Sequence, residues 1–406
     1  MSIRNFILKF FSLQGYRIKG MEVEGKEILV RVELKRRTGS CPGCGKRSRR
    51  LHQYQREQKV CHKLVGDFWV YLVGRKRRWW CERCQKAFTE EWPAVRKWSR
   101  RTVVAEAQIL SLLRDNSFRG VEERYGISDE VSRWVLKRAK IGSGWEAESR
   151  EWKIRLGIDE HSFRGRDLVI TVTNLKRRRV VAVLPDDRQE TFRRFMSEIP
   201  DSIRRRVEEV CVDMKPGFIE VVKQQLSAAA IVIDRFHVVQ DANRRLDEAR
   251  RIEQEAVRKP IKKHPFLKAE ERLSEKERQL LDYYLREYPA LREWYWYKEQ
   301  VRRIYWAESK EKAREQLVSI IRCLEASDDA ALNDWGRMLR KYQEYILNYF
   351  NHKTTNAYTE GAHTKMKLIK RLSYGYRNVE VYIKKVLLAF IPITLIPLLL
   401  NFYHTF

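Results

Sequence analysis

The pattern of hydrophobic and polar positions divides the chain into four stretches. In residues 21–95, short runs alternate apolar and charged side chains, most clearly from Glu27 to Leu34, and these runs predict strands. In residues 100–140, apolar side chains recur at helical spacing. A turn at residues 126–128 separates two helical segments of this stretch, and the second begins at Asp129, so the stretch predicts a helix-turn-helix.

The third stretch, residues 152–257, is typical of an α/β domain. Strand-like runs occur at Lys153–Asp159, Leu168–Thr173, Val180–Leu184, Glu209–Asp213 and Ala229–Asp234, with helical runs at Gln189–Ile199 and Phe218–Leu226. Three consecutive strands predict an antiparallel meander, and the later strands, separated by helices, would extend that sheet in parallel. This order is the one that an RNase H-like core uses.

The fourth stretch, residues 240–350, is rich in charge and almost free of glycine. Its apolar positions predict long amphipathic helices, at Asn243–Arg258, Ser274–Arg286, Leu291–Trp306 and Lys310–Leu324. The stretch is either a helical domain inserted into the α/β unit or a separate helical domain. Only the chemistry of the residues that follow it favours an insertion.

The charge of the chain is far from neutral. It has 83 Lys and Arg against 54 Asp and Glu, which gives a formal net charge of +29. An excess of this size favours a polyanionic partner, and nucleic acid is the commonest one. Aromatic residues interleave with basic ones at residues 76–80 and 374–377, which suits phosphate contact combined with base stacking. A merely solubilising or ribosome-associated surface is therefore the weaker interpretation.

The sequence predicts neither secretion nor a membrane span. The apolar run from Val386 to Leu400 is shorter than the roughly 20 residues that a spanning helix needs, and it contains two prolines, so we expect a buried C-terminal segment. The N-terminal residues 1–13 lack a cleavage site, and the seven cysteines are an odd number. Both features favour a reducing compartment.

Two Cys-x-x-Cys pairs predict a zinc site. The pairs are Cys41 with Cys44 and Cys81 with Cys84. Together they supply the four thiolates of a structural Zn²⁺, which leave no open position for a catalytic water. The gap between the pairs exceeds the usual zinc-ribbon spacing, so we expect a loop to fill it. Metal-free or redox-active pairs are the alternative, and Cys61 or His62 could replace one ligand.

Three carboxylates predict a second metal site, which would hold Mg²⁺ or Mn²⁺. Asp159 and Asp213 each end a strand-like run, and carboxylates at the ends of adjacent strands can converge on hard cations. Two such cations activate a nucleophile and stabilise the leaving oxygen of a phosphodiester. Glu360, near the start of a predicted helix, is the best third ligand. Singly, each carboxylate has a plainer interpretation as a turn, cap or salt-bridge residue, and Glu160 could replace Asp159.

Other residues are candidates for supporting roles. Asp234 closes the last strand, and it and His237 either face the carboxylate site or serve only as a helix cap and a packed ring. The candidates for DNA contact are Arg133 and Lys137 on the second helix of the helix-turn-helix, and Lys367, Lys370, Arg371 and Arg377 after Glu360. Lys367 lies two helical turns from Glu360 and would hold phosphates of the scissile strand. Whether Arg133 contacts a base or a phosphate stays open.

With these motifs the chain resembles bacterial insertion-sequence transposases of the ISL-three type, which are DDE enzymes. The resemblance extends from about Gly20 to Leu388. It rests on Cys41-Pro-Gly-Cys44-Gly with Cys81-x-x-Cys84, Gly157-Ile158-Asp159-Glu160, Val212-Asp213-Met214, Asp234-Arg235-Phe236-His237, Thr355-Asn356 to Glu360-Gly361, and Arg371 with Gly375-Tyr376-Arg377-Asn378. The apolar run from Ile391 to Phe406 corresponds to no family role that we can name.

The resemblance implies a multi-domain α+β fold. It implies a zinc-ribbon domain, a helix-turn-helix domain, the first part of an RNase H-like core, a helical insertion and the C-terminal part of the core. We expect these at residues 1–95, 96–145, 150–240, 241–350 and 351–406. Asp159, Asp213 and Glu360 would be the catalytic triad, Lys367 the basic residue that follows the glutamate, and Asp234 with His237 an auxiliary motif.

The implied function is DNA transposition in the bacterial cytoplasm, at the nucleoid. The enzyme would bind the terminal inverted repeats, cut double-stranded DNA and join the freed end to target DNA, as a homodimer that holds two ends. Two alternatives stay open: a catalytically inactive zinc-ribbon and helix-turn-helix DNA-binding protein, and an RNase H-like nuclease acting on structured nucleic acid.

Overall fold

The protein folds as two compact units. The computed structural model describes residues 10–11, 13–142, 144–145, 148 and 152–400. One unit combines Met1–Gly142 with Leu368–Phe406, and the other is Ser143–Lys367. Each unit contains its own five-stranded sheet. Among the described residues, no helix is both long and apolar enough to cross a membrane.

The sheet of the first unit has the strand order β1-β2-β6-β5, and β7 also pairs with β6. The strands are β1 (Tyr16–Glu24), β2 (Glu27–Leu34), β5 (Leu51–Val65), β6 (Phe68–Cys81) and β7 (Lys86–Thr89). The predicted strand at 27–34 is confirmed as β2. Its alternate side chains Val30 and Val32 enter a buried cluster with Val70 and Leu72 of β6, because successive side chains of a strand point to opposite faces.

The two cysteine pairs lie at turns of this unit. A short hairpin of β3 (Gly39–Ser40) and β4 (Arg47–Ser48) encloses Cys41 and Cys44. Cys81 is the last residue of β6, and Cys84 lies in the turn before β7. The prediction of a loop between the two cysteine pairs is wrong. The long antiparallel strands β5 and β6 occupy that gap, and their ladder satisfies the backbone groups that a loop would leave to water.

Three helices form the predicted helix-turn-helix region: α2 (Val103–Asp115), α3 (Phe118–Tyr125) and α4 (Asp129–Arg138). Each helix begins where a hydroxyl accepts a free backbone N–H of the first turn. The acceptors are Thr102, Ser117 and Ser128. Gly126, with φ 67°, ends α3 in the left-handed conformation that glycine adopts without strain.

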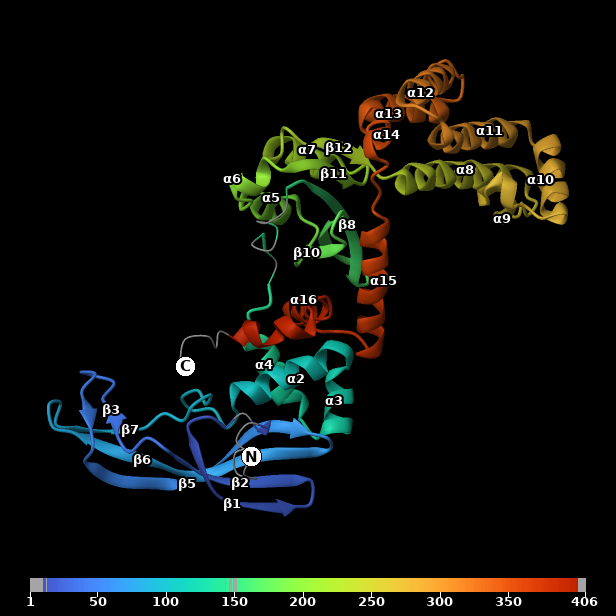
Figure 1. The fold of residues 1–406 in the computed structure, drawn as a ribbon. Coiled ribbons are helices and arrows are strands. Elements are labelled where there is room, and N and C mark those ends of the chain that lie inside the picture. Colours follow the sequence, from blue (N-terminus) through green and yellow to red (C-terminus); the bar gives the residue numbers. More distant parts are fainter. Residues whose placement is uncertain (1–9, 12, 143, 146–147, 149–151, 401–406) are drawn as a thin grey trace. The chain divides into compact units, whose positions relative to one another are not determined.

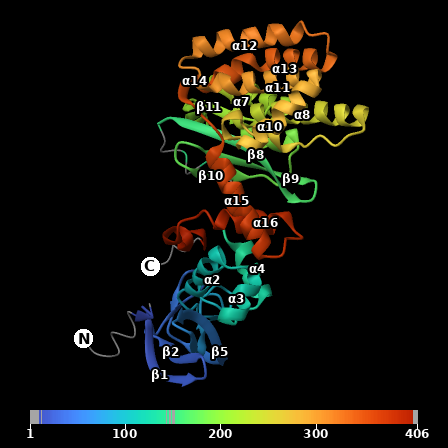
Figure 2. The ribbon, with the colours of Figure 1, turned by 90° about the vertical axis from the view of Figure 1, so that its right-hand side faces the viewer.

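Helix α16 (Val379–Leu388), from the far end of the chain, completes the first unit and contacts α2 and α4 (Figures 1 and 2). Lys384 Nζ donates to the carbonyl oxygens of Lys137 and, at 3.1 Å, Ala139. The buried Lys385 Nζ donates to the carbonyl oxygen of Arg114 at 3.4 Å. The two lysines therefore satisfy carbonyls at the C-terminal ends of α4 and α2, which have no partner inside their own helices.

The sheet of the second unit has the order β10-β9-β8-β11-β12. The strands are β8 (Ile154–Arg164), β9 (Asp167–Asn174), β10 (Arg179–Val183), β11 (Val207–Val212) and β12 (Ala230–Ile233). The first three form an antiparallel meander, and β11 and β12 run parallel to β8. This is the predicted RNase H-like order. Helices α5 (Gln189–Ser197), α6 (Asp201–Arg204) and α7 (Pro216–Gln225) connect its strands.

A run of helices lies between β12 and α15 (Ala357–Leu372) in the chain. They are α8 (Arg235–Val257), α9 (His264–Leu267), η2 (Glu270–Arg272), α10 (Glu275–Glu287), α11 (Pro289–Arg303), η3 (Ile304–Trp306), α12 (Lys310–Glu325), α13 (Ala330–Leu347) and α14 (Tyr349–His352). Their buried side chains, such as Leu246 and Trp335, share one hydrophobic cluster with Ile158 of β8. They are therefore an insertion packed on the α/β core, and not a separate domain.

Several expected boundaries differ from the structure. Strand β8 continues to Arg164, so Asp159 lies inside a strand and does not end one. Helix α8 begins at Arg235, well before the predicted residue 243, because Asp234 caps it. Helix α13 lies outside the predicted helices. The expected C-terminal segment 351–406 is divided between the units, since Leu368–Phe406 packs with the N-terminal residues. The five-segment domain division stays a proposal.

The apolar C-terminal run is buried in part. Val386, Leu388 and Ile396 are buried, whereas Ile393 and Leu395 are exposed. The segment η4 (Ile393–Leu400) contacts α2. The run thus packs against the helices of the first unit through some of its side chains only. Residues 401–406, at its end, lie outside the described part of the chain.

Candidate functional site

The parallel pairing of β8 and β11 brings Asp159 and Asp213 together. Cys211 of β11 is level with Gly157 of β8. Because the two strands run parallel, the residues two positions later, Asp213 and Asp159, also lie side by side. Oxygen atoms of both carboxylates and a ring nitrogen of His237 lie within 4.8 Å of one another.

Helix α8 places His237 at the two aspartates. Its Nε2 is 2.7 Å from Asp213 Oδ1 and 4.0 Å from Asp159 Oδ1. Asp234 is buried and caps the helix, with Oδ1 accepting the Phe236 N–H at 3.4 Å. Of the two interpretations of this motif, the structure combines parts of both. Asp234 caps the helix, and His237 faces the carboxylates one turn later.

Helix α15 carries Glu360 toward the same strands. The side-chain amide of Asn356 donates to the Ile158 carbonyl at 3.0 Å, and the hydroxyls of Thr359 and Thr173 are 2.7 Å apart. The helix can approach β8 this closely because residue 157 is glycine: a Cβ there would lie 2.5 Å from Asn356 Oδ1. Glu360 is half-buried, and its carboxylate is outside the group formed by Asp159, Asp213 and His237.

Electrostatics couple Glu360 to the other acidic residues. Burial raises the pKa of Glu360, and the charges of Asp234 and Asp213 raise it further. Burial and the charge of Asp213 raise the pKa of Asp159 to about 7. Burial lowers the pKa of His237, but the hydrogen bond to Asp213 and three nearby carboxylates outweigh burial and raise it to about 9.

These pKa shifts show that the site buries more negative charge than the nearby positive groups balance. Carboxylates whose pKa is raised by one another gain most from a divalent cation, which binds their ionised form. The donor set of two carboxylates and one imidazole, with Glu360 nearby, fits Mg²⁺ or Mn²⁺, since oxygen ligands suit both and Mn²⁺ also accepts nitrogen.

Glu160 does not join this group. Its carboxylate forms an ion pair with Lys215 at 2.5 Å, and Lys215 also lies 3.5 Å from Asp187. Successive side chains of β8 point to opposite faces, so Glu160 and Asp159 diverge. Glu160 is therefore the less suitable of the two as a ligand.

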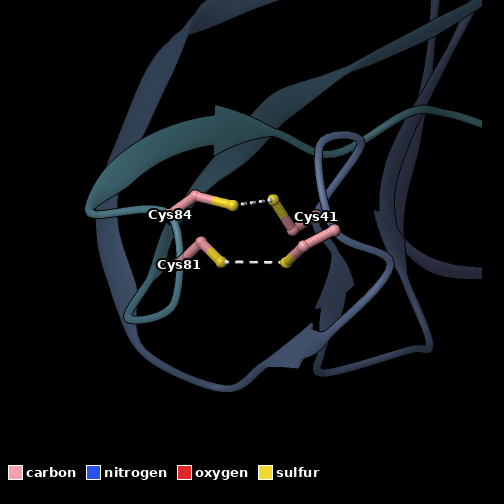
Figure 3. Close-up of side chains that lie close together, drawn as sticks. Cys41, Cys81 and Cys84 are labelled. Atoms are coloured by element: carbon pink, nitrogen blue, oxygen red, sulfur yellow. Dashed lines mark hydrogen bonds between the residues drawn. The ribbon is translucent and has the colours of Figure 1, made fainter.

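The sulfur atoms of the four cysteines lie as a tetrahedral zinc ion requires. Figure 3 shows Cys81 and Cys84 facing the hairpin that carries Cys41. The Sγ atoms of Cys41 and Cys84 are 3.8 Å apart, and those of Cys44 and Cys81 are 3.6 Å apart. Four thiolates about 2.3 Å from a central Zn²⁺ stand roughly 3.8 Å from one another. Backbone N–H groups of Gly43 and Cys44 lower the pKa of Cys41 to about 7, which favours the thiolate.

Cys61 and His62 are not part of this cluster. Burial raises the pKa of Cys61 to about 12, so its thiol stays protonated. His62 is buried, and its Nδ1 is 3.1 Å from the Thr102 hydroxyl. Neither residue replaces a zinc ligand.

Comparison with known proteins identifies the family. Residues 156–386, more than half of the chain, match the model of the ISL3-type DDE transposases, described as "Transposase". The chain belongs to this transposase family. Residues 37–84 match the zinc-finger of the transposases of IS204, IS1001, IS1096 and IS1165. The chain is also 25% identical, over 93% of its length and 96% of the relative's, to the transposase for insertion sequence element IS1001 of Bordetella parapertussis.

Family membership makes this chain an enzyme of the transposase kind. The match to the zinc-finger model agrees with the sulfur geometry and supports a zinc ribbon that holds structural zinc. The match to the transposase model includes all three predicted catalytic carboxylates. It does not assign their roles, which stay predictions.

The predicted DNA-contact residues of the transposase lie on helices and turns. Arg133 and Lys137 are exposed on α4. Arg133 forms an ion pair with Asp129 at 2.5 Å, and its guanidinium lies 4.4 Å from the centre of the Phe118 ring. The others are Lys367, Lys370 and Arg371 on α15, and Arg377 in the turn before α16. All but Lys370 are exposed.

His363 lies at this site and Lys215 lies beside it, although neither residue was predicted from the sequence. His363 is buried, and its Nδ1 lies 3.4 Å from Asp159 Oδ2. Its pKa is lowered to about 4 by burial and by the charge of Lys367, so it is neutral at pH 7. The spacing Glu360-x-x-His363 on one helix could have revealed it, since residues three apart share a helix face. No local signal marks Lys215, whose partner Glu160 is 55 residues away.

Proposed function

We propose that this transposase binds the terminal inverted repeats of its insertion sequence and catalyses metal-dependent cleavage and strand transfer of DNA. Asp159, Asp213 and Glu360 would hold Mg²⁺ or Mn²⁺. When bound, such ions lower the pKa of a water nucleophile and stabilise the leaving oxygen of the phosphodiester. The proposal rests on one observation. Ligand atoms of Asp159, Asp213 and His237 lie within 4.8 Å of one another, on the sheet that α15 packs against.

The residues around the carboxylates would orient them. His237, held by its hydrogen-bonding distance of 2.7 Å to Asp213, fixes the direction of that carboxylate. Asn356, Thr359 and Gly157 set the distance between α15 and β8, and thereby the position of Glu360. A neutral His363 against Asp159 leaves the charge of that carboxylate available to a cation.

The first unit would supply recognition of the DNA end. It combines the zinc ribbon with the helix-turn-helix, and we assign contact with double-stranded DNA to Arg133 and Lys137 on α4, with Lys367, Lys370, Arg371 and Arg377 contacting phosphates or bases. We further propose a homodimer on DNA, since two ends must be joined to one target. The enzyme would act at the bacterial nucleoid, in the cytoplasm, where its substrate lies.

The test is cleavage of a labelled duplex that carries the terminal repeat of the element, with Mg²⁺ or Mn²⁺. Wild type should nick at the repeat end and transfer the strand. Asp213→Asn and Glu360→Gln should bind the duplex but lose cleavage and transfer by about 100-fold or more, because a neutral amide cannot replace a metal-binding carboxylate. Matched controls are Asp201→Asn and Glu190→Gln, whose side chains are 81% and 84% exposed on α6 and α5.

The outcomes separate the competing functions. If both site variants cut as well as wild type, the triad is wrong. If wild type binds but never cuts under any metal, an inactive DNA-binding protein is the better description. Cleavage of branched DNA without strand transfer and without preference for the repeat would indicate a structure-specific nuclease.

A further inference from the structure

The turn that follows α15 contains an aromatic residue at a position that favours glycine. Helix α15 ends at Leu372. The N–H of Gly375 donates to the Lys370 carbonyl at 2.9 Å, and that of Tyr374 donates to the Arg371 carbonyl at 3.0 Å. These two bonds define a Schellman motif, in which the residue at the place of Tyr374 adopts the left-handed conformation and is usually glycine.

Tyr374 adopts this conformation at a cost. Its φ is 52°, a region where a side chain with a Cβ is strained relative to glycine. Burial of the side chain does not offset this strain, because Tyr374 is 93% exposed. A bulky aromatic side chain that destabilises its own helix cap and lies in water is more readily explained by a ligand than by folding.

The surroundings of Tyr374 indicate an anionic ligand. Arg371 and Arg377 flank it in sequence and are exposed. Tyr374 also lies close enough to Arg119 of α3 to interact with it electrostatically. An exposed planar ring near arginine residues suits nucleic acid, whose phosphates pair with arginine and whose bases stack on aromatic rings.

The turn is also fixed to the helix-turn-helix. Tyr376 is buried, and its hydroxyl is 2.7 Å from the Ser373 hydroxyl. Its ring meets Phe118, the first residue of α3, edge to face at 6.4 Å. The guanidinium of Arg133, on α4, lies over the same Phe118 ring. The position of Tyr374 is therefore set relative to the helix that we assign to DNA recognition, within one compact unit.

We propose that Tyr374 is a DNA-contacting residue, whose ring stacks on a base that is locally unstacked from the duplex beside the segment bound by α4, with Arg371 and Arg377 on the adjacent phosphates. This inference rests on the proposed DNA binding and extends it to a residue outside the helix-turn-helix. The surface joins residues about 240 positions apart in the sequence, from Arg133 to Arg377. A protein partner or a second copy of the chain is the competing occupant.

The experiment uses full-length protein and a duplex with the terminal repeat, labelled with fluorescein for affinity and with 2-aminopurine at successive positions for base unstacking. Tyr374→Gly should be at least as thermally stable as wild type, because glycine relieves the strained cap. It should nevertheless bind roughly 5- to 150-fold more weakly and lose the 2-aminopurine fluorescence rise, as expected for the loss of one stacked base. Tyr374→Phe should keep both properties. Tyr283→Ala, an exposed tyrosine on α10, is the control.

Three results would overturn the inference. The first is a Tyr374→Gly variant that binds the duplex as tightly as wild type. The second is weakened binding in which the fluorescence rise persists. The third is unchanged DNA binding with a changed molecular mass by light scattering, which would assign Tyr374 to a contact between copies. If wild type itself binds no duplex DNA, the proposed function fails as well, so the two failures are distinguishable.

Discussion

At the scale of single residues, the candidate active site depends on side chains that permit a close approach. Gly157 stands where α15 meets β8, and a Cβ there would lie within 2.7 Å of Asn356 Oδ1, Leu175 Cδ2 and Thr359 Oγ1. The hydroxyls and amide that fill this space are buried and hydrogen-bonded to one another or to the strand. Gly361, a glycine within α15 itself, has no such neighbour, since nothing lies within 4 Å of its ideal Cβ.

We predict that Gly157→Ala moves α15 off β8. Overpacking of this kind costs about 1–3 kcal/mol in the free energy of unfolding, and the displacement of Glu360 should lower the cleavage rate further than the stability loss explains. Urea denaturation and the cleavage assay measure the two effects. Gly361→Ala should instead stabilise the helix by about 0.5–1 kcal/mol, because alanine loses less backbone entropy there. Equal stability of both variants would contradict the tight approach.

The stability of the first unit should depend on pH through the buried His62. Burial lowers the pKa of His62 below its ordinary 6.5. Below about pH 6.5, the His62 side chain therefore binds a proton in the unfolded chain but not in the folded protein. The contribution of neutral His62 to the free energy of unfolding is complete above about pH 6.5, and it is lost as the pH falls toward the pKa of the folded state. Unfolding in urea with zinc present should show wild type losing more stability between pH 7.5 and 5.5 than His62→Gln does. The exposed His52 provides the control, His52→Gln, which should retain the wild-type slope.

At the scale of elements, short turns and helix ends receive partners from distant parts of the chain. The two cysteine pairs join a hairpin at residues 39–48 to the end of β6 and the start of β7. The lysines of α16 satisfy the last carbonyls of α2 and α4. In both places an element is held by a contact with residues that are distant in the sequence.

Removal of zinc should therefore unfold the cysteine hairpin without affecting the carboxylate site. Cys81→Ser should lower the bound zinc from one ion per chain and weaken DNA binding, because three thiolates hold the ion poorly. Zinc content measured by metal analysis, together with hydrogen exchange of residues 39–48, checks this. Cys323→Ser, at an exposed cysteine on α12, should change neither quantity. Full zinc content in Cys81→Ser would show that the four-cysteine site is misassigned.

At the scale of the whole molecule, chain order and compact units do not coincide. Helix α15 contributes its first residues to one unit and its last to the other, and the C-terminal segment packs with the N-terminal domain. Glu360 and the first residues of the C-terminal segment of the first unit thus lie on one continuous helix. The net charge of +29 is spread over a chain whose two units each have their own core.

Truncation after Asn378 should disable DNA binding although it leaves the zinc ribbon, the helix-turn-helix sequence and the proposed DNA contacts from Lys367 to Arg377 intact. The truncated chain lacks Lys384 and Lys385, so the ends of α4 and α2 lose their partners, and the buried side chains of α16 are lost. We expect a lower melting temperature for the first unit and early proteolysis within residues 100–140. Wild-type affinity for the terminal repeat in the truncated protein would contradict this assignment.

The affinity for DNA should also fall steeply with salt. Each phosphate contact releases counterions, so a plot of log affinity against log salt has a slope of about −0.9 for each contact with duplex DNA. Replacement of Lys367 or Arg371 by glutamine should make the slope less negative by about one. An unchanged slope in both variants would remove them from the set of phosphate contacts.

The amino-acid sequence was enough to predict the family, the strand order of the core and the cluster of four cysteines, because hydrophobic periodicity and Cys-x-x-Cys spacing are local properties of the chain. It also singled out Asp159, Asp213 and Glu360, although their catalytic roles still await the cleavage assay. Three-dimensional packing was needed to show that His237 and His363 face the aspartates, that Glu160 pairs instead with Lys215, and that α16 completes the helix-turn-helix. Those outcomes depend on strand register, on the side of a strand to which a residue points, and on packing between segments hundreds of residues apart, none of which a local pattern encodes.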